Sequence, residues 1–401
     1  MVSNKIIEFC NVMNICIFTY VYISKHRGGI ERVTETLVTE LTKRDHRVYI
    51  ISVCKPIEDN LSEENKFTLP NNEVNSTENE TFIKKFLARN KIDIILNQTE
   101  VKSLFNLITK TRNNIPLISC IHTDPLATLK ATKDNWDEWK IKKGIRFWFK
   151  IPYFASRKIF QYYSRKKYIS KKHREYYEKS DAVVLLSKRF KESFIKISGI
   201  NDSKKLYFIS NPNSYDITEC TVIKKENIVL FVGRLVFQKR LDRLLRIWDR
   251  IKNRQGWKLV IVGDGPERYF YENLCIKWNI DNVEFVGHCD PTPYYQKARI
   301  LCATSSHEGF GLTITEAMQH NAIPIAFNSY ESIEDIISDG IDGFTIRPFS
   351  ISDYSKTLKR LINDTLYREQ ILENIKQKNI LNRYSIDKII EKWEELLSNL
   401  Q

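Results

Sequence analysis

Two carboxylates with seven residues between them mark the stretch 305–316, which reads Ser-Ser-His-Glu-Gly-Phe-Gly-Leu-Thr-Ile-Thr-Glu. Gly309 and Gly311 follow the first acid, Glu308, so we expect a sharp turn there before the chain becomes helical. The second acid, Glu316, would then lie in the first turns of the helix. Free backbone N–H groups at the start of that helix could hold an anion. The structural alternative is a tight corner followed by a glutamate that favours the helix macrodipole.

Two cations in the second half of the chain could neutralise a diphosphate. Arg234 follows Gly233 at the expected end of a strand, and Lys239 precedes an expected helix. An arginine binds phosphate oxygens through a bidentate fork, and a lysine acts as a point charge. The alternative is a solvated helix start, although cations are locally unfavourable at the positive end of a helix dipole.

Three weaker signals lie elsewhere in the chain. Gly28 and Gly29 follow the first predicted strand, where they permit a simple turn or a close approach of the backbone to a phosphate or sugar. His122 ends another predicted strand, and a lone histidine is more often structural than catalytic. The Gly263-x-Gly265 pair matches only part of a dinucleotide-binding fingerprint. No His or Cys group has the spacing of metal ligands, so no metal site is predicted.

Alternating strands and helices must position these residues. The predicted strands cover 14–23, 48–53, 92–97, 116–122, 181–186 and 205–211 in the first half, and 228–232, 258–262, 283–286, 300–304 and 323–326 in the second. Helical patterns separate most of them, whereas 56–79 shows no clear period. Such alternation predicts parallel sheets with right-handed crossovers, whose ligands bind at the carboxyl ends of the strands.

The length of 401 residues and the repeated α/β pattern predict two domains that face a cleft. We assign the first domain to 1–212, a linker to 213–226, the second domain to 227–384 and a final amphipathic helix to 385–401. No signal-peptide layout opens the chain, and no run of about 18 apolar residues could cross a bilayer. The protein is therefore expected in the cytoplasm.

The segment 140–174, which begins at Lys140 and ends at Arg174, differs from the rest of the chain. It contains thirteen Lys or Arg, nine aromatic residues and no Asp or Glu, in a chain whose formal net charge is +14. Such a composition suits an anionic membrane surface or a lipid-linked substrate. Solvated helix faces are an alternative. RNA binding by base stacking is another, but no nucleic-acid-binding signature accompanies the segment, so no nucleic-acid partner is predicted.

Together, these motifs resemble the retaining glycosyltransferases of family 4, also called glycosyltransferase group 1. The resemblance spans nearly the whole chain and is strongest over 227–348. It implies the GT-B architecture, in which two Rossmann-like, doubly wound domains face each other and a C-terminal helix crosses back to the first domain. The motifs that carry it are Gly28-Gly-Ile-Glu-Arg32, Gly233-Arg234 with Lys239, Gly263-Asp-Gly-Pro266, and the pair Glu308 and Glu316.

The resemblance also implies a role for each motif. Arg234 and Lys239 would hold the diphosphate of a nucleotide-sugar donor, and Glu316 its ribose. The first domain would approach the donor through Gly28 and Gly29. The donor sugar and phosphates would contact Glu308 and the backbone of Gly309, Phe310, Gly311, Leu312 and Thr313.

His122 matches a histidine that the family often places near the reaction centre, so His122 and Glu308 are the predicted catalytic residues. The resemblance implies that neither a metal ion nor another cofactor takes part, because cations and a helix dipole would stabilise the leaving nucleotide diphosphate.

The predicted function is the retaining transfer of a hexose or N-acetylhexosamine from a nucleotide diphosphate sugar, with UDP as the expected nucleotide. The acceptor would be a glycan or a polyprenyl-diphosphate-linked glycan in surface polysaccharide synthesis. Because segment 140–174 is more basic and aromatic than the family pattern leads us to expect, the protein is predicted to lie peripherally at the inner face of the cell membrane. The alternatives are a GT-B sugar-nucleotide epimerase and a non-catalytic scaffold that binds lipid or nucleic acid.

Overall fold

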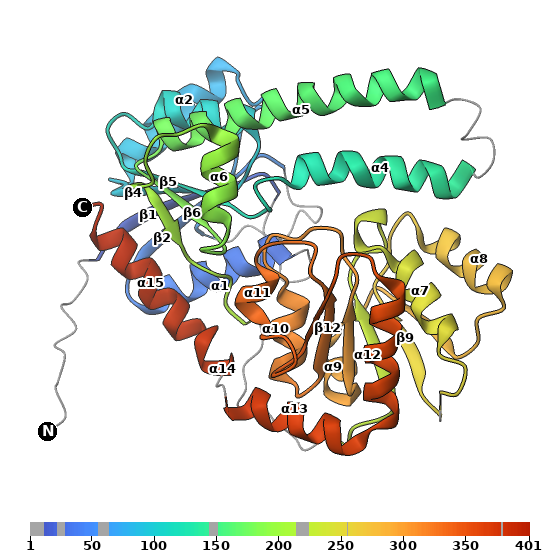
Figure 1. Ribbon diagram of the computed structural model, residues 1–401. Coiled ribbons are helices and arrows are strands. Elements are labelled where there is room, and N and C mark those ends of the chain that lie inside the picture. Colours follow the sequence, from blue (N-terminus) through green and yellow to red (C-terminus); the bar gives the residue numbers. More distant parts are fainter. Residues whose placement is uncertain are drawn as a thin grey trace, which may run out of the picture.

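The computed structural model describes residues 12–21, 29–54, 64–143, 151–213, 224–254, 256–377 and 380–401. Within these ranges the chain forms two parallel β-sheets, each with helices packed on its faces (Figure 1). This arrangement confirms the predicted α/β class with two Rossmann-like units. Gly28 and residues 144–150 of the basic aromatic segment lie outside the described residues.

The first sheet contains seven strands in the order β3-β2-β1-β4-β5-β6-β7, all of them parallel. Its central strands β4 and β5 are buried at every position, because helices cover both faces of the sheet. The strands are β1 (Asn14–Thr19), β2 (Arg47–Ser52), β3 (Lys66–Thr68), β4 (Ile94–Asn97), β5 (Leu117–Ile121), β6 (Ala182–Leu185) and β7 (Leu206–Phe208). The helices are α1 (Gly29–Lys43), α2 (Thr77–Arg89), α3 (Lys102–Thr111), α4 (Ala127–Lys143), α5 (Ile151–Lys179) and α6 (Phe190–Ser198).

The second sheet contains six parallel strands in the order β10-β9-β8-β11-β12-β13. The strand order reverses beside β8, as it does beside β1 in the first sheet, and α/β sheets bind ligands at such switch points. The strands are β8 (Ile228–Val232), β9 (Lys258–Val262), β10 (Val283–Gly287), β11 (Ile300–Ala303), β12 (Ile323–Phe327) and β13 (Phe344–Ile346). The helices are α7 (Leu241–Arg250), α8 (Arg268–Trp278), α9 (Thr292–Lys297), α10 (Leu312–Gln319), α11 (Ile333–Ile336), α12 (Ile351–Asn363) and α13 (Thr365–Gln377), with a short 3-10 turn at Phe237–Lys239.

The last two helices, α14 (Ile380–Arg383) and α15 (Ile386–Ser398), carry the chain back to the first sheet (Figure 1). The apolar stripe of α15, which includes Ile389, Trp393 and Leu397, is buried in the same core cluster as Met13 and Leu37 of the first sheet and its helix. The predicted C-terminal helix that crosses back to the first domain is therefore confirmed.

Several elements differ from the sequence prediction. The stretch 56–79 contains the edge strand β3, which is too short to produce a visible period, and α2 begins at Thr77 where the Ser76 side chain accepts a hydrogen bond from Asn79 N. The prediction assigned no element between 339 and 384, where the structure has β13, α12 and α13. Helix α6 begins at Phe190, and the Ser187 hydroxyl before it accepts a hydrogen bond of 3.0 Å from Arg189 N and donates to Asp335 in the second unit.

Glycines allow the turns after β8 and β9 to pack on each other. A Cβ atom at Gly263, whose φ is +135°, would overlap the carbonyl oxygen of Gly233. A Cβ atom at Gly265 would lie 2.5 Å from the carbonyl oxygen of Leu235. This close backbone contact fixes the turn that carries Arg234, so the Gly263-x-Gly265 signal has a packing explanation.

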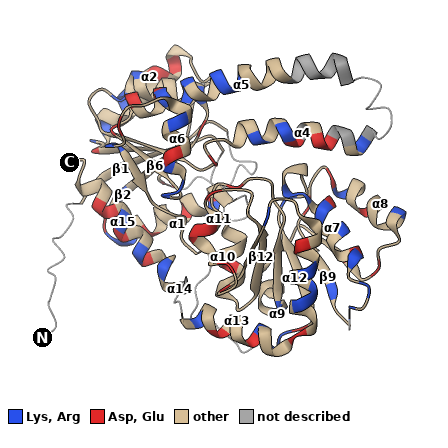
Figure 2. Ribbon diagram, in the orientation of Figure 1, with Lys and Arg blue, Asp and Glu red and all other residues tan. Residues whose placement is uncertain are grey.

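Helices α4 and α5 form a long hairpin that extends from the first unit, with α4 on the side of the second unit (Figures 1 and 2). The described outer half of α5 exposes five large apolar or aromatic side chains within ten residues, interspersed with basic ones. The five are Ile159, Phe160, Tyr162, Tyr163 and Tyr168. None of the helices in the described ranges has both the length and the apolar character needed to cross a bilayer.

Candidate active site

A cleft of about 540 Å³ lies between the two units, at the carboxyl ends of β8, β9 and β11. Three residues predicted from the sequence line it together: Arg234 after β8, Lys239 in the following 3-10 turn and Glu308 after β11. The opposite wall is α4 of the first unit, through Asp134 and Glu138 among others. Parallel strands therefore bring residues that are more than 60 positions apart in the sequence into one cavity.

Hydrogen bonds tie the two turns of the second unit to each other. Lys239 Nζ forms an ion pair with Glu308 Oε1. The Gln238 side chain donates to His307 O at 2.7 Å, and Ser306 N donates to Gln238 O at 2.9 Å. The positions of Lys239 and Glu308 are consequently coupled through both side chains and backbone.

Arg234 differs from Lys239 in having no carboxylate partner among the described residues. Its side chain is exposed at the cleft, and it forms no ion pair with a carboxylate anywhere in the described part of the chain. Such a guanidinium is available for an anionic ligand.

The turn that leads into α10 touches the first unit. A Cβ atom at Gly309 would overlap the carbonyl oxygen of His122, so only glycine permits this approach between the two units. Gly311 precedes α10 with a φ of +107°. Gly29 faces the same helix, but a Cβ atom there would lie 3.4 Å from Leu312 Cδ1, which is an ordinary contact. Leu312 and Thr313 are half-buried at the start of α10.

Glu316 is fully buried and is not part of the cleft lining. Its Oε1 forms an ion pair with Arg32 of α1, and its Oε2 accepts a hydrogen bond of 2.8 Å from the Tyr295 hydroxyl. Each carboxylate oxygen has more than one lone pair, so Glu316 keeps some capacity to accept further hydrogen bonds. The Phe310 side chain is also buried, and its ring centroid lies 5.2 Å from that of Tyr384. The backbone of Phe310 is therefore the part that belongs to the turn.

A second cavity of about 350 Å³ lies in the first unit, at the carboxyl ends of β1, β4 and β5, and His122 lines it. His122 Nε2 lies 2.5 Å from Gln98 Oε1, while Nδ1 is buried and has no hydrogen-bond partner among the described residues. Burial lowers the pKa of His122 to about 4, against the opposing influence of Glu100. The imidazole is therefore neutral near pH 7.

Glu100 holds the loop that follows His122. Its Oε1 accepts hydrogen bonds from Thr123 N at 3.1 Å and Thr123 Oγ1 at 2.7 Å, and its Oε2 pairs with Lys172 of α5 at 2.7 Å. Burial acts to raise the pKa of Glu100, but Lys172 and these hydrogen bonds hold it below its ordinary value. The carboxylate is thus charged and fixes the loop against α5.

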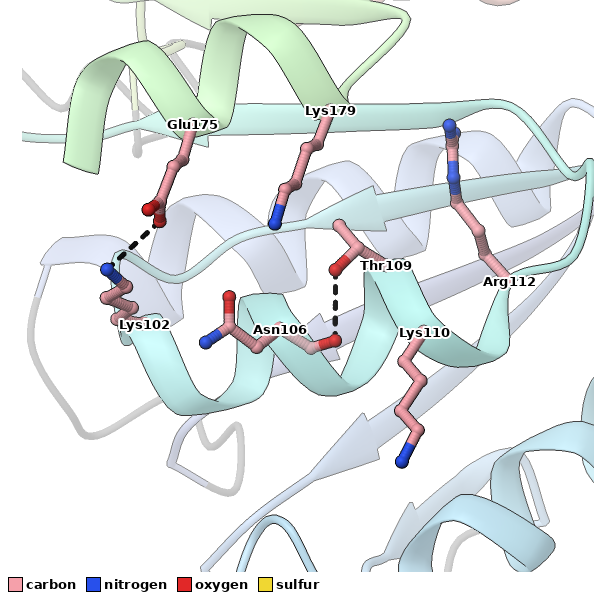
Figure 3. Close-up of a pocket in the computed structure, with 7 residues that line it drawn as sticks. All are labelled: Lys102, Asn106, Thr109, Lys110, Arg112, Glu175 and Lys179. Atoms are coloured by element: carbon pink, nitrogen blue, oxygen red, sulfur yellow. Dashed lines mark hydrogen bonds and ion pairs between the residues drawn. The ribbon is translucent and has the colours of Figure 1, made fainter. Parts of the chain in front are cut away.

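A third depression, of about 570 Å³, lies between α3 and the end of α5 on the surface of the first unit (Figure 3). Most of its cations have carboxylate partners: Lys102 lies 3.0 Å from Glu175, and Arg112 pairs with Asp181. The depression contains none of the predicted site residues. No group of three or more potential metal ligands occurs in the described ranges.

The sequence did not single out three residues that the structure places at the site. Arg32 ends the Gly28-Gly-Ile-Glu-Arg32 motif, but only the position of Glu316 in the fold reveals its partner. His307 directly precedes Glu308 in the sequence. Across the cleft, Asp134 Oδ2 on α4 lies 3.3 Å from His307 Nδ1. No local pattern marks Asp134, because its partners in the described part of the chain are more than 100 residues away in the sequence.

Family models match both units. The model described as Glycosyltransferase Family 4 matches residues 27–212, and the model described as Glycosyl transferases group 1 matches residues 217–378.

Individual relatives and a solved structure are also similar to this chain. The amylovoran biosynthesis glycosyltransferase AmsD of Erwinia amylovora is 31% identical over 205 residues, which are 49% of this chain and 56% of that protein. The chain thus spans little more than half the length of this relative. A Campylobacter jejuni protein is 26% identical over 400 residues, 96% of this chain and 98% of that protein. It is named as the alpha-1,4-N-acetyl-D-galactosaminyltransferase of an undecaprenol-diphosphate-linked GalNAc-GalNAc-diNAcBac glycan.

The structure of HepE from Anabaena, in complex with UDP and glucose, superposes with a TM-score of 0.72. The superposition covers 96% of this chain and 100% of HepE at 16% identity, which shows a shared GT-B fold. The two family models account for most of the chain, on both sides of the cleft. The chain therefore belongs to the family 4, group 1 glycosyltransferases.

Proposed function

We propose that this protein is a retaining, metal-independent glycosyltransferase that moves a hexose or N-acetylhexosamine from a UDP-sugar to a glycan or lipid-linked acceptor in surface polysaccharide synthesis. The observation that carries the proposal is the convergence of Arg234, Lys239 and Glu308 on one cleft between two Rossmann-like units. A cationic pair beside a glycine turn and a helix start is the chemistry that a diphosphate requires.

The donor would bind with its diphosphate beside Arg234 and Lys239. Binding would release Lys239 from part of its ion pair with Glu308, whose carboxylate would then accept hydrogen bonds from the donor sugar. The backbone from Gly309 to Thr313 would support the phosphates, and Glu316 would accept a hydrogen bond from the ribose. Similarity to HepE, whose structure contains UDP and glucose, supports a UDP-sugar as the donor.

The acceptor would enter from the cavity of the first unit that His122 lines. Among the described residues, its lining includes Thr19, Thr99, Thr123 and the carboxylates of Glu31 and Glu100. Hydroxyls and carboxylates suit the hydroxyl groups of a sugar, whereas the two carboxylates would repel a diphosphate. We therefore assign this cavity to the terminal sugar of the acceptor and expect any lipid diphosphate to lie outside it.

The chemical step would rest on stabilisation of the leaving group. Arg234, Lys239 and the N–H groups at the start of α10 would carry the charge that develops on the UDP diphosphate. His122, neutral and with its Nδ1 lone pair unused, would contact the donor sugar or the incoming hydroxyl near the reaction centre.

The exposed face of α5 supports a peripheral location at the inner face of the membrane. Lys166, Lys167 and Lys171 are exposed there beside Phe160 and Tyr163. Basic side chains attract anionic headgroups, and aromatic rings favour the interface. Similarity to the Campylobacter protein, whose name includes an undecaprenol-linked glycan, supports a lipid-linked acceptor.

A panel of sugar nucleotides tests the proposal. The purified protein is incubated with UDP-glucose, UDP-galactose, UDP-GlcNAc, UDP-GalNAc and GDP-mannose, with and without polyprenyl-diphosphate-linked glycans. We expect one UDP-sugar to raise the Tm by several degrees, because a ligand at 100 times its Kd adds about 2.7 kcal/mol to stability. The same UDP-sugar should release UDP faster when acceptor is present.

The other functions predict different results from the same panel. A sugar-nucleotide epimerase would release UDP together with a rearranged sugar in the absence of an acceptor. A non-catalytic scaffold would show no Tm shift with any sugar nucleotide.

A further inference from the structure

We infer that Asp134 of α4 is a positioning residue of the donor site, which aligns the two turns that carry Lys239 and Glu308 when α4 lies across the cleft. The inference rests on the proposed function and adds a first-domain residue to the donor site. It makes the geometry of the diphosphate site depend on where the acceptor-side hairpin α4–α5 lies.

Asp134 is a buried carboxylate whose partners among the described residues all belong to the second unit. Its Oδ2 accepts a hydrogen bond from Ser306 Oγ and lies 3.3 Å from His307 Nδ1. Its Oδ1 lies 3.9 Å from Arg240 Nη1. The residue is 6% exposed, so these groups supply most of the compensation for the loss of water.

The partners of Asp134 lie directly beside the predicted donor residues. Ser306 and His307 precede Glu308, and Arg240 follows Lys239. The Asp134 carboxylate of the first unit therefore contacts both the turn at 237–240 and the turn at 305–308. Gln238 joins the same two turns within the second unit. If α4 moved away from the cleft, the bridge would be lost and the Lys239–Glu308 geometry would be held from one side only.

Other contacts of α4 hold the helix in place without reaching the turn at 305–308. Asp137 Oδ2 lies 3.4 Å from Arg240 Nη1, and Lys142 Nζ lies 2.7 Å from Glu267 Oε2. Their side chains are 29% and 34% exposed, so they are less desolvated than Asp134. Asp137 shares Arg240 with Asp134, but neither Asp137 nor Lys142 has a recorded contact with Ser306 or His307, so substitutions there separate docking of α4 from the contact of Asp134 with the turn at 305–308.

The hairpin connects Asp134 to the basic aromatic segment. Arg165 of α5 donates a hydrogen bond of 2.7 Å to Thr132 Oγ1, two residues before Asp134 on α4. If a bound acceptor or membrane displaced α5, this hydrogen bond would therefore shift α4 and with it the position of Asp134. Aligned donor turns would matter most in the transition state, and interactions that are stronger there than in the ground state raise kcat.

The test compares Asp134→Asn with Asp137→Asn and Lys142→Met in the full-length protein. With the UDP-sugar that the panel identifies, we expect Asp134→Asn to lower kcat by at least about tenfold, equivalent to about 1.4 kcal/mol of barrier, with little change in the KM of the donor. The two control variants should stay within about twofold of the wild type. Asp134→Glu should restore part of the lost kcat.

Hydrogen exchange provides a second readout that needs no turnover. Amides of residues 305–308 should exchange faster in Asp134→Asn and at wild-type rates in both controls, while the Tm shows that all variants are folded. Ser306→Ala, which removes a partner of Asp134 from the other side, should reproduce the kcat loss and add little to it in the double variant.

The inference would be overturned if Asp134→Asn, Asp137→Asn and Lys142→Met had equal effects on kcat and exchange. It would also be overturned if Asp134→Asn changed neither quantity. A wild-type protein that turns over no sugar nucleotide would contradict the proposed function instead, and the exchange rates would still decide whether Asp134 aligns the turns.

Discussion

His122 combines near-complete burial with one ring nitrogen that makes no hydrogen bond within the described chain. Its other nitrogen faces Gln98, and its carbonyl group abuts Gly309 of the second unit. This residue therefore lies where the two units meet. A neutral imidazole at that point suits hydrogen bonding to sugar hydroxyls better than binding to phosphate.

The shifted pKa of His122 predicts a pH dependence of stability. The unfolded chain takes up a proton near the ordinary pKa of 6.5, whereas the folded chain does so only near 4. Since the unfolded state binds more protons between these values, the free energy of unfolding should fall as the pH is lowered from 6.5 to 4, by roughly 3 kcal/mol. His173, whose pKa burial also lowers to about 4, contributes in the same direction.

His122→Gln keeps an amide donor for Gln98 and removes the titration. Urea unfolding of the wild type and of this variant at pH 7, 5.5 and 4.5 should therefore give a shallower loss of stability in the variant. An identical loss in both proteins would mean that His122 is not held neutral by the fold.

At the residue scale, local sequence signals identified one side of the site well. Arg234, Lys239 and Glu308 follow strands and lie beside glycines or a helix start, so their clustering follows from parallel-sheet topology. The contacts of Gly309 with His122 and of Glu316 with Arg32 could not be predicted, because each depends on the relative placement of two separately folded sheets.

At the scale of elements, the hairpin of α4 and α5 forms three structural features of the first unit. Its α4 closes the cleft, the inner end of α5 holds Glu100 through Lys172, and the outer half of α5 exposes basic and aromatic side chains. The sequence identified the composition of this segment but not its shape, because Lys and Arg on a helix give little apolar periodicity. The strand β3 escaped prediction because it is three residues long.

Charge neutralisation on α5 tests its role at a membrane. The triple variant Lys166→Gln, Lys167→Gln and Lys171→Gln changes exposed side chains only. Because each basic residue near an anionic surface contributes about 1 kcal/mol, the variant should sediment far less with vesicles of phosphatidylcholine and phosphatidylglycerol than the wild type does.

The matched control replaces exposed lysines of the same domain, Lys84→Gln, Lys85→Gln and Lys91→Gln, and should bind vesicles as the wild type does. Equal loss in both triple variants would indicate an effect of net charge alone, and equal retention in both would exclude this face of α5 as the membrane contact.

At the scale of the whole molecule, two sheets with the same α/β topology divide the proposed reaction between them. The second unit supplies the cations and the helix start for the donor, and the first supplies His122 and a cavity lined by hydroxyls and carboxylates for the acceptor. The cross-domain contacts of Arg32, Asp134 and Ser187 hold the units together around the cleft. Strand alternation predicted both units, and the apolar stripe of 385–401 predicted the final helix, whose return to the first domain was implied by the family resemblance.

Calorimetric titration of UDP into the wild type, Arg234→Ala and Arg250→Ala tests the central claim most directly. Both arginines are exposed and belong to the second unit, but only Arg234 lines the cleft. A charge-assisted hydrogen bond contributes about 1.5–3 kcal/mol, so Arg234→Ala should weaken UDP binding by roughly 10- to 100-fold. Arg250→Ala should bind within about twofold of the wild type. Equal UDP affinity in all three proteins, or no UDP binding by the wild type, would contradict the assignment of this cleft to a nucleotide-sugar donor.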